Sequence, residues 1–220
     1  MVEVATSLLS IKRENSIKTI YDLEASGTNY FHIDVMDGKF VKNNTTDIMR
    51  EYTEYIKQVA NTPIDVHLMV EDVEAYSKAY IDMGVNSITF HIEALKNETE
   101  VLKMISYIKQ NNVKIGLTLK PKTPIEKIYS YLPYIHSVLV MSVEPGEGGQ
   151  EFIPDTIEKI QKLNKFAYEN GYDIDIEVDG GINDKTAKGV IEAGANIIVA
   201  GSYITNSENY REAIEKLKKY

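Results

Sequence analysis

The sequence lacks several features that would assign it to a familiar class of protein. It has no cysteine, so it can form neither a disulfide framework nor a thiolate metal site. Its 33 acidic residues outnumber its 24 basic ones and leave a net charge of −9, which argues against a nucleic-acid partner. No run approaches the roughly 18 apolar residues of a membrane span, and MVEVATSLLS does not resemble a secretory signal. We therefore expect a soluble, cytoplasmic protein with neither a nucleic-acid nor a membrane partner.

Short β-branched runs alternate with amphipathic segments along the whole chain. The predicted strands are residues 3–7, 30–35, 64–69, 87–92, 113–119, 137–143, 173–178 and 196–201. Residues 155–171, between the sixth and seventh strands, carry apolar side chains at helical spacing, and Gly171 predicts the end of that helix. Strands that alternate with helices indicate a parallel sheet.

A repeated joint indicates how many such units the chain contains. The pattern Gly-x-Asn precedes a predicted strand at Gly27, Gly84 and Gly194, which are 57 and 110 residues apart. These separations approximate two and four units of ~28 residues, and eight such units fill the chain. The sequence therefore predicts a single (β/α)₈ TIM barrel over residues 1–220. An open doubly wound sheet is the alternative, but no GxGxxG turn follows the first strand.

Polar residues interrupt two strands whose inward faces would ordinarily be apolar in a barrel. Residues two apart on a strand share a face, so His32 points the same way as Asp34, and Asp65 the same way as His67. Buried polar groups are costly unless something pairs them. We therefore place His32, Asp34 and His67 near the carboxyl rim of adjacent strands.

Asp179 stands at the corresponding end of the seventh strand, in IEVDGGIN. With His32, Asp34 and His67 it forms a set of two imidazoles and two carboxylates. This set predicts one divalent metal ion per chain, and its nitrogen and oxygen atoms suit Zn²⁺, Fe²⁺, Mn²⁺ or Co²⁺ better than Ca²⁺.

Other residues of these strands have a structural alternative. A lone histidine on a strand is more often a hydrogen-bonded structural residue, and we interpret His91 and His136 in that way. The methionines Met36, Met69 and Met141 are either packing residues or an apolar cap that lowers the dielectric constant around the metal.

Glycine-rich segments follow the last three predicted strands, as EPGEGGQ (144–150), DGGIN (179–183) and GSYI (201–204). One such loop is weak evidence, since glycines mainly make turns. Barrel phosphate sites, however, commonly use the loops after strands seven and eight. Glycine lets backbone N–H groups approach a phosphate, and a short helix starting near Ser202 would add its positive end. No P-loop is present, so a nucleoside triphosphate is not expected.

The segments HIDVMDGKFV, DVHLMV, MSVEPGEGGQEFIP, IEVDGGIN and VAGS, in this order, closely resemble the ribulose-phosphate 3-epimerase family. The resemblance runs from Ser7 to Ser202. It implies a ribulose-phosphate-binding TIM barrel and a metal-dependent isomerase of the pentose phosphate pathway. Such an enzyme interconverts D-ribulose 5-phosphate and D-xylulose 5-phosphate.

The resemblance also implies roles for individual residues. The metal ligands would be His32, Asp34, His67 and Asp179, with Asp34 and Asp179 as the acid–base pair. The residues that bind the sugar phosphate would be Ser7, His67, Gly146, Glu147, Gly148, Gly149, Gly180, Gly181, Gly201 and Ser202. We also expect a homo-oligomer.

Epimerisation at carbon 3 agrees with two carboxylates. A proton must leave one face and return to the other through an enediolate, which two carboxylates on opposite sides can achieve. A divalent cation stabilises the charge that develops on oxygens 2 and 3. We interpret Asp37 as a rim residue that orders its loop.

The chain departs from the family pattern at Lys42, Ile92 and Glu147, where proline, proline and phenylalanine are usual. These changes fall in substrate-facing loops and put the sugar, rather than the chemistry, in question, and D-allulose 6-phosphate 3-epimerase is an alternative. A non-catalytic sugar-phosphate-binding barrel is less consistent with intact Asp34 and Asp179. An aldolase or another isomerase would need a lysine or glutamate at a strand end. Lys120 and Lys122 are the candidates, and we interpret both as solvated loop residues.

Overall fold

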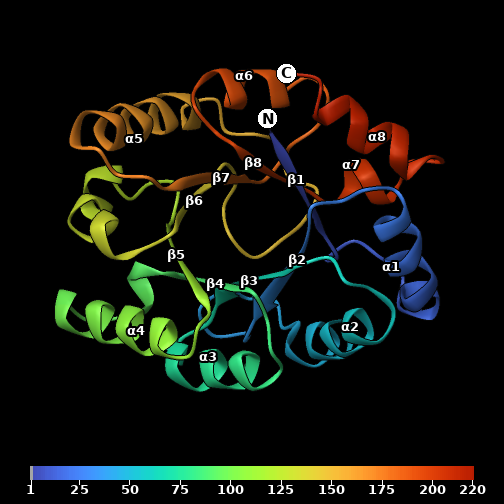
Figure 1. Ribbon diagram of the computed structural model, residues 1–220, viewed down its shortest axis with the longest axis horizontal. Helices are drawn as coiled ribbons and strands as arrows, with labels where there is room; N and C mark the ends of the chain where they lie inside the picture. Colours follow the sequence, from blue (N-terminus) through green and yellow to red (C-terminus); the bar gives the residue numbers. More distant parts are fainter. Residues whose placement is uncertain (1) are drawn as a thin grey trace.

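Eight parallel strands close into a barrel in the computed structural model, which describes residues 2–220 (Figure 1). The strands are β1 (Glu3–Ser7), β2 (Tyr30–Met36), β3 (Ile64–Met69), β4 (Ser87–His91), β5 (Lys114–Leu119), β6 (Ser137–Met141), β7 (Asp175–Asp179) and β8 (Ile197–Ala200). Each pairs with the next along the chain, and β8 pairs with β1. The predicted fold class is therefore confirmed.

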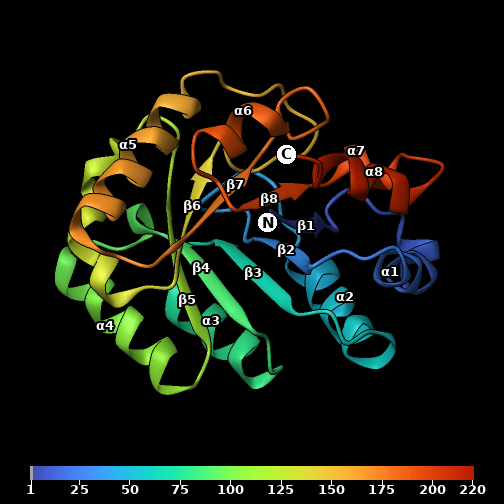
Figure 2. The same cartoon turned by 45° about the horizontal axis from the view of Figure 1, so that its top comes forward.

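Helices surround the barrel on its outside (Figures 1 and 2). They are α1 (Ser16–Ala25), α2 (Thr46–Val59), α3 (Val73–Asp82), α4 (Glu98–Gln110), α5 (Thr156–Asn170), α6 (Ala187–Glu192), α7 (Ser202–Thr205) and α8 (Tyr210–Leu217). A 3₁₀ segment, Ile125–Tyr134, links β5 to β6. It contains Pro133, whose ring and missing N–H oppose an α-helix at that point. Shorter 3₁₀ turns span Arg13–Asn15 and Ile92–Ala94.

Five of the eight predicted strand ranges contain residues that the structure places outside the strands. The fourth strand ends at His91, because Ile92 begins a 3₁₀ turn. The sixth ends at Met141, because the next residue, Ser142, turns to donate its N–H and Oγ to carbonyl oxygens at the end of β7. The helix predicted over 155–171 is α5, and Gly171 ends it with a left-handed φ of 69°.

The three Gly-x-Asn joints share one structure. Their glycines have positive φ, and each asparagine accepts a hydrogen bond from a backbone N–H of the preceding strand through its side-chain oxygen. The bridged pairs are Asn29 with Val4 at 3.0 Å, Asn86 with Ile64 at 2.8 Å and Asn196 with Ile176 at 2.7 Å. The repeat therefore ties successive strands together at the amino end of the barrel.

His136 takes the place of this asparagine before β6. Its Nδ1 accepts from the N–H of Ile115 at 3.2 Å, and its own N–H donates to the carbonyl oxygen of Ile115 at 2.8 Å. This confirms that His136 is a structural residue.

The interior of the barrel has an apolar part and a polar part. A small apolar cluster is formed by Ala5, Leu139, Met141, Val143, Ile197 and Val199. The polar part comes from other strands and is fully or almost fully buried; it includes His32, Asp34, Asp65, His67, Thr89, His91, Thr118 and Glu177. A polar interior of this extent is unusual for a TIM barrel, and it surrounds the candidate site.

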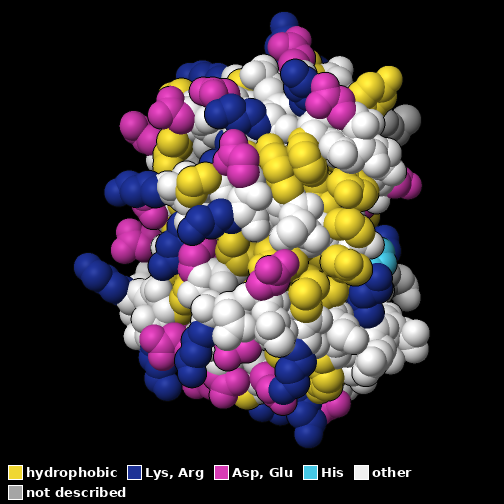
Figure 3. Space-filling view, turned by 90° about the vertical axis from the view of Figure 1, so that its left-hand side faces the viewer, with side chains coloured by type: hydrophobic (Ala, Val, Ile, Leu, Met, Phe, Trp, Pro, Cys, Tyr) yellow, Lys and Arg dark blue, Asp and Glu magenta, His cyan; other side chains and the backbone are white. Residues whose placement is uncertain are grey.

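One side of the molecule carries a group of hydrophobic side chains, visible in Figure 3. This is the side of Figure 1 that holds α4, the 3₁₀ segment and α5. Tyr134 and Tyr168 are exposed there, and Tyr129 stacks on Phe166 with ring centroids 3.8 Å apart. The expected homo-oligomer stays a prediction.

Within residues 2–220, no helix combines the length and apolar character that crossing a membrane requires.

Replacing Gly116 with alanine should destabilise the barrel. A Cβ atom at this position of β5 would lie 2.2 Å from Oγ1 of Thr89 and 2.6 Å from Oγ of Ser137. Overpacking a filled interior costs about 1–3 kcal/mol, which urea unfolding would measure. Gly189→Ala in α6 is the control, because the nearest atom there, Cδ1 of Ile157, is 3.4 Å away and alanine favours a helix by about 0.5–1 kcal/mol. Equal stability of the two variants would contradict this account.

Candidate active site

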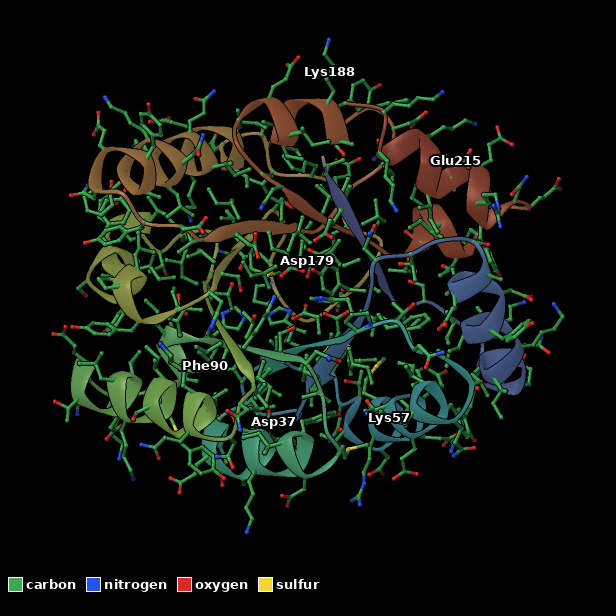
Figure 4. All side chains as sticks on the ribbon, in the orientation of Figure 1. Asp37, Lys57, Phe90, Asp179, Lys188 and Glu215 are labelled. Atoms are coloured by element: carbon green, nitrogen blue, oxygen red, sulfur yellow. The ribbon has the colours of Figure 1, made fainter. Side chains whose placement is uncertain are left out.

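Four predicted ligand residues converge inside the barrel. His32, Asp34, His67 and Asp179 each offer one ligand atom, and these atoms all lie within 4.8 Å of one another. Nε2 of His32 and Nδ1 of His67 each lie 3.4 Å from Oδ1 of Asp34. The same two nitrogens lie 4.0 and 3.8 Å from Oδ2 of Asp179. Figure 4 shows Asp179 near the centre of the ring of strands.

The pairing of β2 with β3 brings together three of the four residues of this cluster, His32, Asp34 and His67. Its register places His32 beside Asp65 and Asp34 beside His67. Asp179 enters from β7, which is separated from β2 by β8 and β1. Both histidines have no exposed surface, so they lie deeper than the rim position expected from the sequence. Burial at this depth does not leave each ring wholly unpaired, because the nitrogen that faces away from the cluster, here called the outward nitrogen, makes a hydrogen bond.

Those hydrogen bonds involve Asp65 for His32 and His91 for His67. Nδ1 of His32 lies 2.7 Å from Oδ2 of Asp65, whose Oδ1 accepts from Oγ of Ser87 at 2.6 Å. Nε2 of His67 lies 3.0 Å from Nε2 of His91. Asp65 is a functional residue not expected from the sequence, where its place on the same strand face as His67 is the signal that points to it.

The inward nitrogens of the two histidines are without hydrogen-bond partners. Nε2 of His32 and Nδ1 of His67 are buried, and neither makes a hydrogen bond to any residue from 2 to 220. Buried polar atoms are ordinarily paired. Both nitrogens face the carboxylates of Asp34 and Asp179. Two imidazole nitrogens and two carboxylates around one point form a donor set that fits a divalent cation.

The two carboxylates have different electrostatic surroundings. Burial opposes ionisation of Asp34, but the imidazoles of His32 and His67, each 3.4 Å from its Oδ1, hold its pKa below the usual range. Burial, followed by the charge of Asp34, raises the pKa of Asp179 to about 6. Burial, with the charge of Asp65, also raises the pKa of Glu177 to about 8. A bound cation would favour the ionised form of both ligand carboxylates.

A cavity of about 340 Å³ opens beside the cluster. Most of the residues expected to bind a sugar phosphate line it: Ser7, Gly146, Glu147, Gly148, Gly149, Gly180, Gly181, Gly201 and Ser202. Asp34 and Asp179 also line it, as do Met36, Met69 and Met141. His67, which was expected both to bind substrate and to ligate metal, is not among the lining residues. In addition, Oγ of Ser7 donates to Oδ2 of Asp34 at 2.6 Å.

Two of the loop glycines are required by packing. A Cβ atom on Gly180 would lie 2.4 Å from Cγ2 of Val143, and one on Gly181 would lie 2.7 Å from the backbone nitrogen of Phe152. Both residues also have positive φ, at 120° and 65°. Turn formation and close packing therefore already explain these two glycines, whatever ligand the cavity accepts.

The remaining predicted residues lie around the site. The carboxylate of Asp37 accepts from the backbone N–H groups of Lys39, Phe40 and Glu71, which orders this loop as expected. Nζ of Lys120 lies 4.2 Å above the Phe40 ring. Neither Lys120 nor the exposed Lys122 lines the cavity. No lysine-based chemistry is therefore supported at this cavity.

Two of the three residues that depart from the family pattern lie at the edge of the cavity, whereas Ile92 packs against the hydrophobic core. Lys42 and Glu147 are both exposed and line one groove beside the cavity. Nε2 of Gln150 donates to the carbonyl oxygens of Glu144 and Glu147, at 2.7 and 2.8 Å, and so closes this loop.

Comparison with solved structures shows shared architecture. The 3-hexulose-6-phosphate synthase of Salmonella typhimurium matches with a TM-score of 0.72 at 15% identity, covering 99% of this chain and 97% of the other. Thiamine phosphate pyrophosphorylase from Pyrococcus furiosus matches with a TM-score of 0.63 at 16% identity, covering 99% and 94%. At these identities the likeness concerns the fold alone.

Comparison of sequences is more specific. The ribulose-phosphate 3-epimerase of Methanocaldococcus jannaschii is 39% identical over 218 residues, which cover 99% of this chain and 90% of the relative. The enzyme of the same name from Bacillus subtilis is 39% identical over 219 residues, covering 99% of both. The family model described as "Ribulose-phosphate 3 epimerase family" matches residues 3–205. With the motifs and the cluster of His32, Asp34, His67 and Asp179, these matches show that the chain belongs to the ribulose-phosphate 3-epimerase family.

Proposed function

We propose that this chain is a metal-dependent isomerase that inverts carbon 3 of D-ribulose 5-phosphate to form D-xylulose 5-phosphate. The observation that carries the proposal is the position of Asp34 and Asp179 in the cavity wall. They come from β2 and β7 and share contacts with the same two histidines. Two carboxylates on separate strands can reach a substrate from two sides.

Each aspartate then exchanges a proton with one face of carbon 3. One carboxylate removes the proton and leaves an enediolate, and the other returns a proton to the opposite face. A divalent cation held by His32, Asp34, His67 and Asp179 would stabilise the negative charge that develops on oxygens 2 and 3. With one carboxylate on each side, no catalytic group has to move from one face of the substrate to the other.

The two oxygens of Asp34 have separate surroundings, which supports a double role for this residue. Oδ1 lies 3.4 Å from a nitrogen of each histidine, on the side of the proposed ligands. Oδ2 accepts the hydrogen bond from Ser7, which lines the cavity. One oxygen can therefore serve as ligand while the other, oriented by Ser7, faces carbon 3.

The phosphate would bind to backbone donors in the part of the cavity formed by the loops after β7 and β8. Gly180, Gly181, Gly201 and Ser202 line this region, and α7 begins at Ser202.

The preference for a ketopentose rests on the family. D-Allulose 6-phosphate is the competing substrate, because Lys42 and Glu147 line a groove beside the cavity that a longer sugar could approach. A coupled assay with both phosphoketoses, on protein of measured metal content, tests this choice.

The purified protein should contain one divalent metal ion per chain, and His67→Ala should lose most of it. The reason is that His67 supplies one of the two buried nitrogens without a hydrogen-bond partner in the part of the chain that the structure describes. Elemental analysis after gel filtration measures the content. His136→Asn is the control, since it changes a histidine of the strand joints and should retain the metal. Stoichiometric metal in His67→Ala would reject the ligand assignment.

Turnover in D₂O should place deuterium at carbon 3 of the product, whereas substrate recovered early should contain little. Asp34→Asn and Asp179→Asn should each lower kcat by at least the ~10²–10⁴ expected for a lost general acid or base. Either variant can still exchange the carbon 3 proton of one epimer, because one carboxylate remains. NMR on metal-replete variants measures both effects. If one substitution abolished exchange from both epimers and the other left turnover nearly intact, a one-base mechanism would replace this one.

A further inference from the structure

We propose that His91 and Glu93 are positioning residues that hold His67 with Nδ1 directed at the cation. The inference rests on the proposed metal site and concerns residues that are not among its ligands. From the sequence, His91 is expected to be a structural residue, and no pattern points to Glu93. In the structure these two residues form a chain of contacts that begins at the outward nitrogen of His67.

The first contact fixes which nitrogens carry protons. Nε2 of His67 and Nε2 of His91 are 3.0 Å apart, and both side chains are completely buried. One of these nitrogens must donate and the other accept, because a neutral imidazole has one N–H and one lone pair. If His67 binds a cation through Nδ1, its Nε2 carries the proton and donates it to His91. The proton of His91 must then be on Nδ1.

The second contact favours that arrangement. Nδ1 of His91 lies 3.6 Å from Oε2 of Glu93. Among residues 2–220, neither atom has a hydrogen-bond partner. A carboxylate oxygen accepts and cannot donate, so Glu93 favours the N–H on the side of His91 that faces it. The chain therefore has one direction, from His67 through His91 to Glu93.

The surroundings hold Glu93 and His91 in place. The other carboxylate oxygen of Glu93 accepts from the N–H of Lys120 at 2.8 Å and from Oγ1 of Thr123 at 2.5 Å. Nζ of Lys159, on α5, donates to the carbonyl oxygens of Pro121 and Thr123. The loop after β5 is thereby anchored around the carboxylate.

The histidine ring is held from two sides. Its centroid lies 5.1 Å from that of His67, which it meets edge to edge through Nε2, and 5.0 Å from that of Phe40. His32 has the shorter equivalent of this arrangement, since Asp65 contacts its outward nitrogen directly. Each ligand histidine is therefore oriented by a carboxylate, one directly and one through His91. Such outer partners commonly change metal affinity 10–100-fold.

Glu93→Gln is the sharpest test, because it keeps the size of the side chain and its acceptor for Lys120 and Thr123. Its amide NH₂ would face Nδ1 of His91 and favour the proton on Nε2, opposite the N–H of His67. We expect zinc affinity, measured by competition with a chromophoric chelator, to fall by about tenfold. Nitrogen NMR of the zinc-loaded protein should show His91 protonated at Nδ1 in the parent and at Nε2 in the variant.

Two further variants test the chain at His91. His91→Phe keeps a ring but accepts no hydrogen bond, and it should weaken zinc binding by about 10–100-fold. His91→Gln offers an amide oxygen and should recover much of the loss. His136→Asn, which preserves the joint before β6, should bind zinc as the parent does.

The outcomes separate this inference from the proposed function. Parent affinity in a folded Glu93→Gln, or a His91 already protonated at Nε2 in the zinc-loaded parent, would overturn the positioning role. If His91→Phe does not fold, the Glu93→Gln result decides. A parent protein that binds no divalent metal would instead overturn the proposed metal site.

Discussion

Two imidazole rings buried at the centre of the barrel impose the main constraint on this structure. A buried polar nitrogen without a partner is costly, and each ring has two nitrogens to satisfy. On the outward side, His32 contacts Asp65 and His67 contacts His91. On the inward side, both nitrogens face Asp34 and Asp179 and have no hydrogen bond within residues 2–220. The protein's own side chains therefore pair the outward nitrogen of each ring, and the inward nitrogens are the ones that a ligand would pair.

This constraint explains why the barrel interior is divided. Polar side chains of β2, β3, β4 and β7 gather around the histidines, whereas the apolar cluster contains residues of β1, β6 and β8. Clustering the polar groups lets each lie within reach of another. It also accounts for the opposed pKa shifts of Asp34 and Asp179, because the first has the closer contacts to both histidines. In the enzyme with a bound cation, the charge of the cation would favour the ionised forms of both Asp34 and Asp179.

Outside this polar centre, backbone conformation and close packing explain the glycines of the loop after β7. Gly180 and Gly181 adopt positive φ and leave no room for a side chain against Val143 and Phe152. Their backbone is thus fixed at the cavity wall before any substrate arrives. At the opposite, amino end of the strands, the joint asparagines and His136 hold successive strands together. The loops with Lys42 and Glu147 lie at the other end of the barrel, beside the cavity.

The sequence by itself predicted the architecture and the four residues, His32, Asp34, His67 and Asp179, that converge in the cluster. Alternating strand and helix patterns predicted the eight-stranded barrel, because periodicity and turn glycines are local properties. The two-residue period of a strand likewise placed His32 with Asp34 and Asp65 with His67. Only the tertiary structure decided how deep these residues lie and what holds them. The 3.0 Å contact between His67 and His91, and the approach of Glu93 to His91, depend on the packing of β3, β4 and the loop after β5. Local patterns carry no information on such contacts, because they arise only when distant segments close into one barrel.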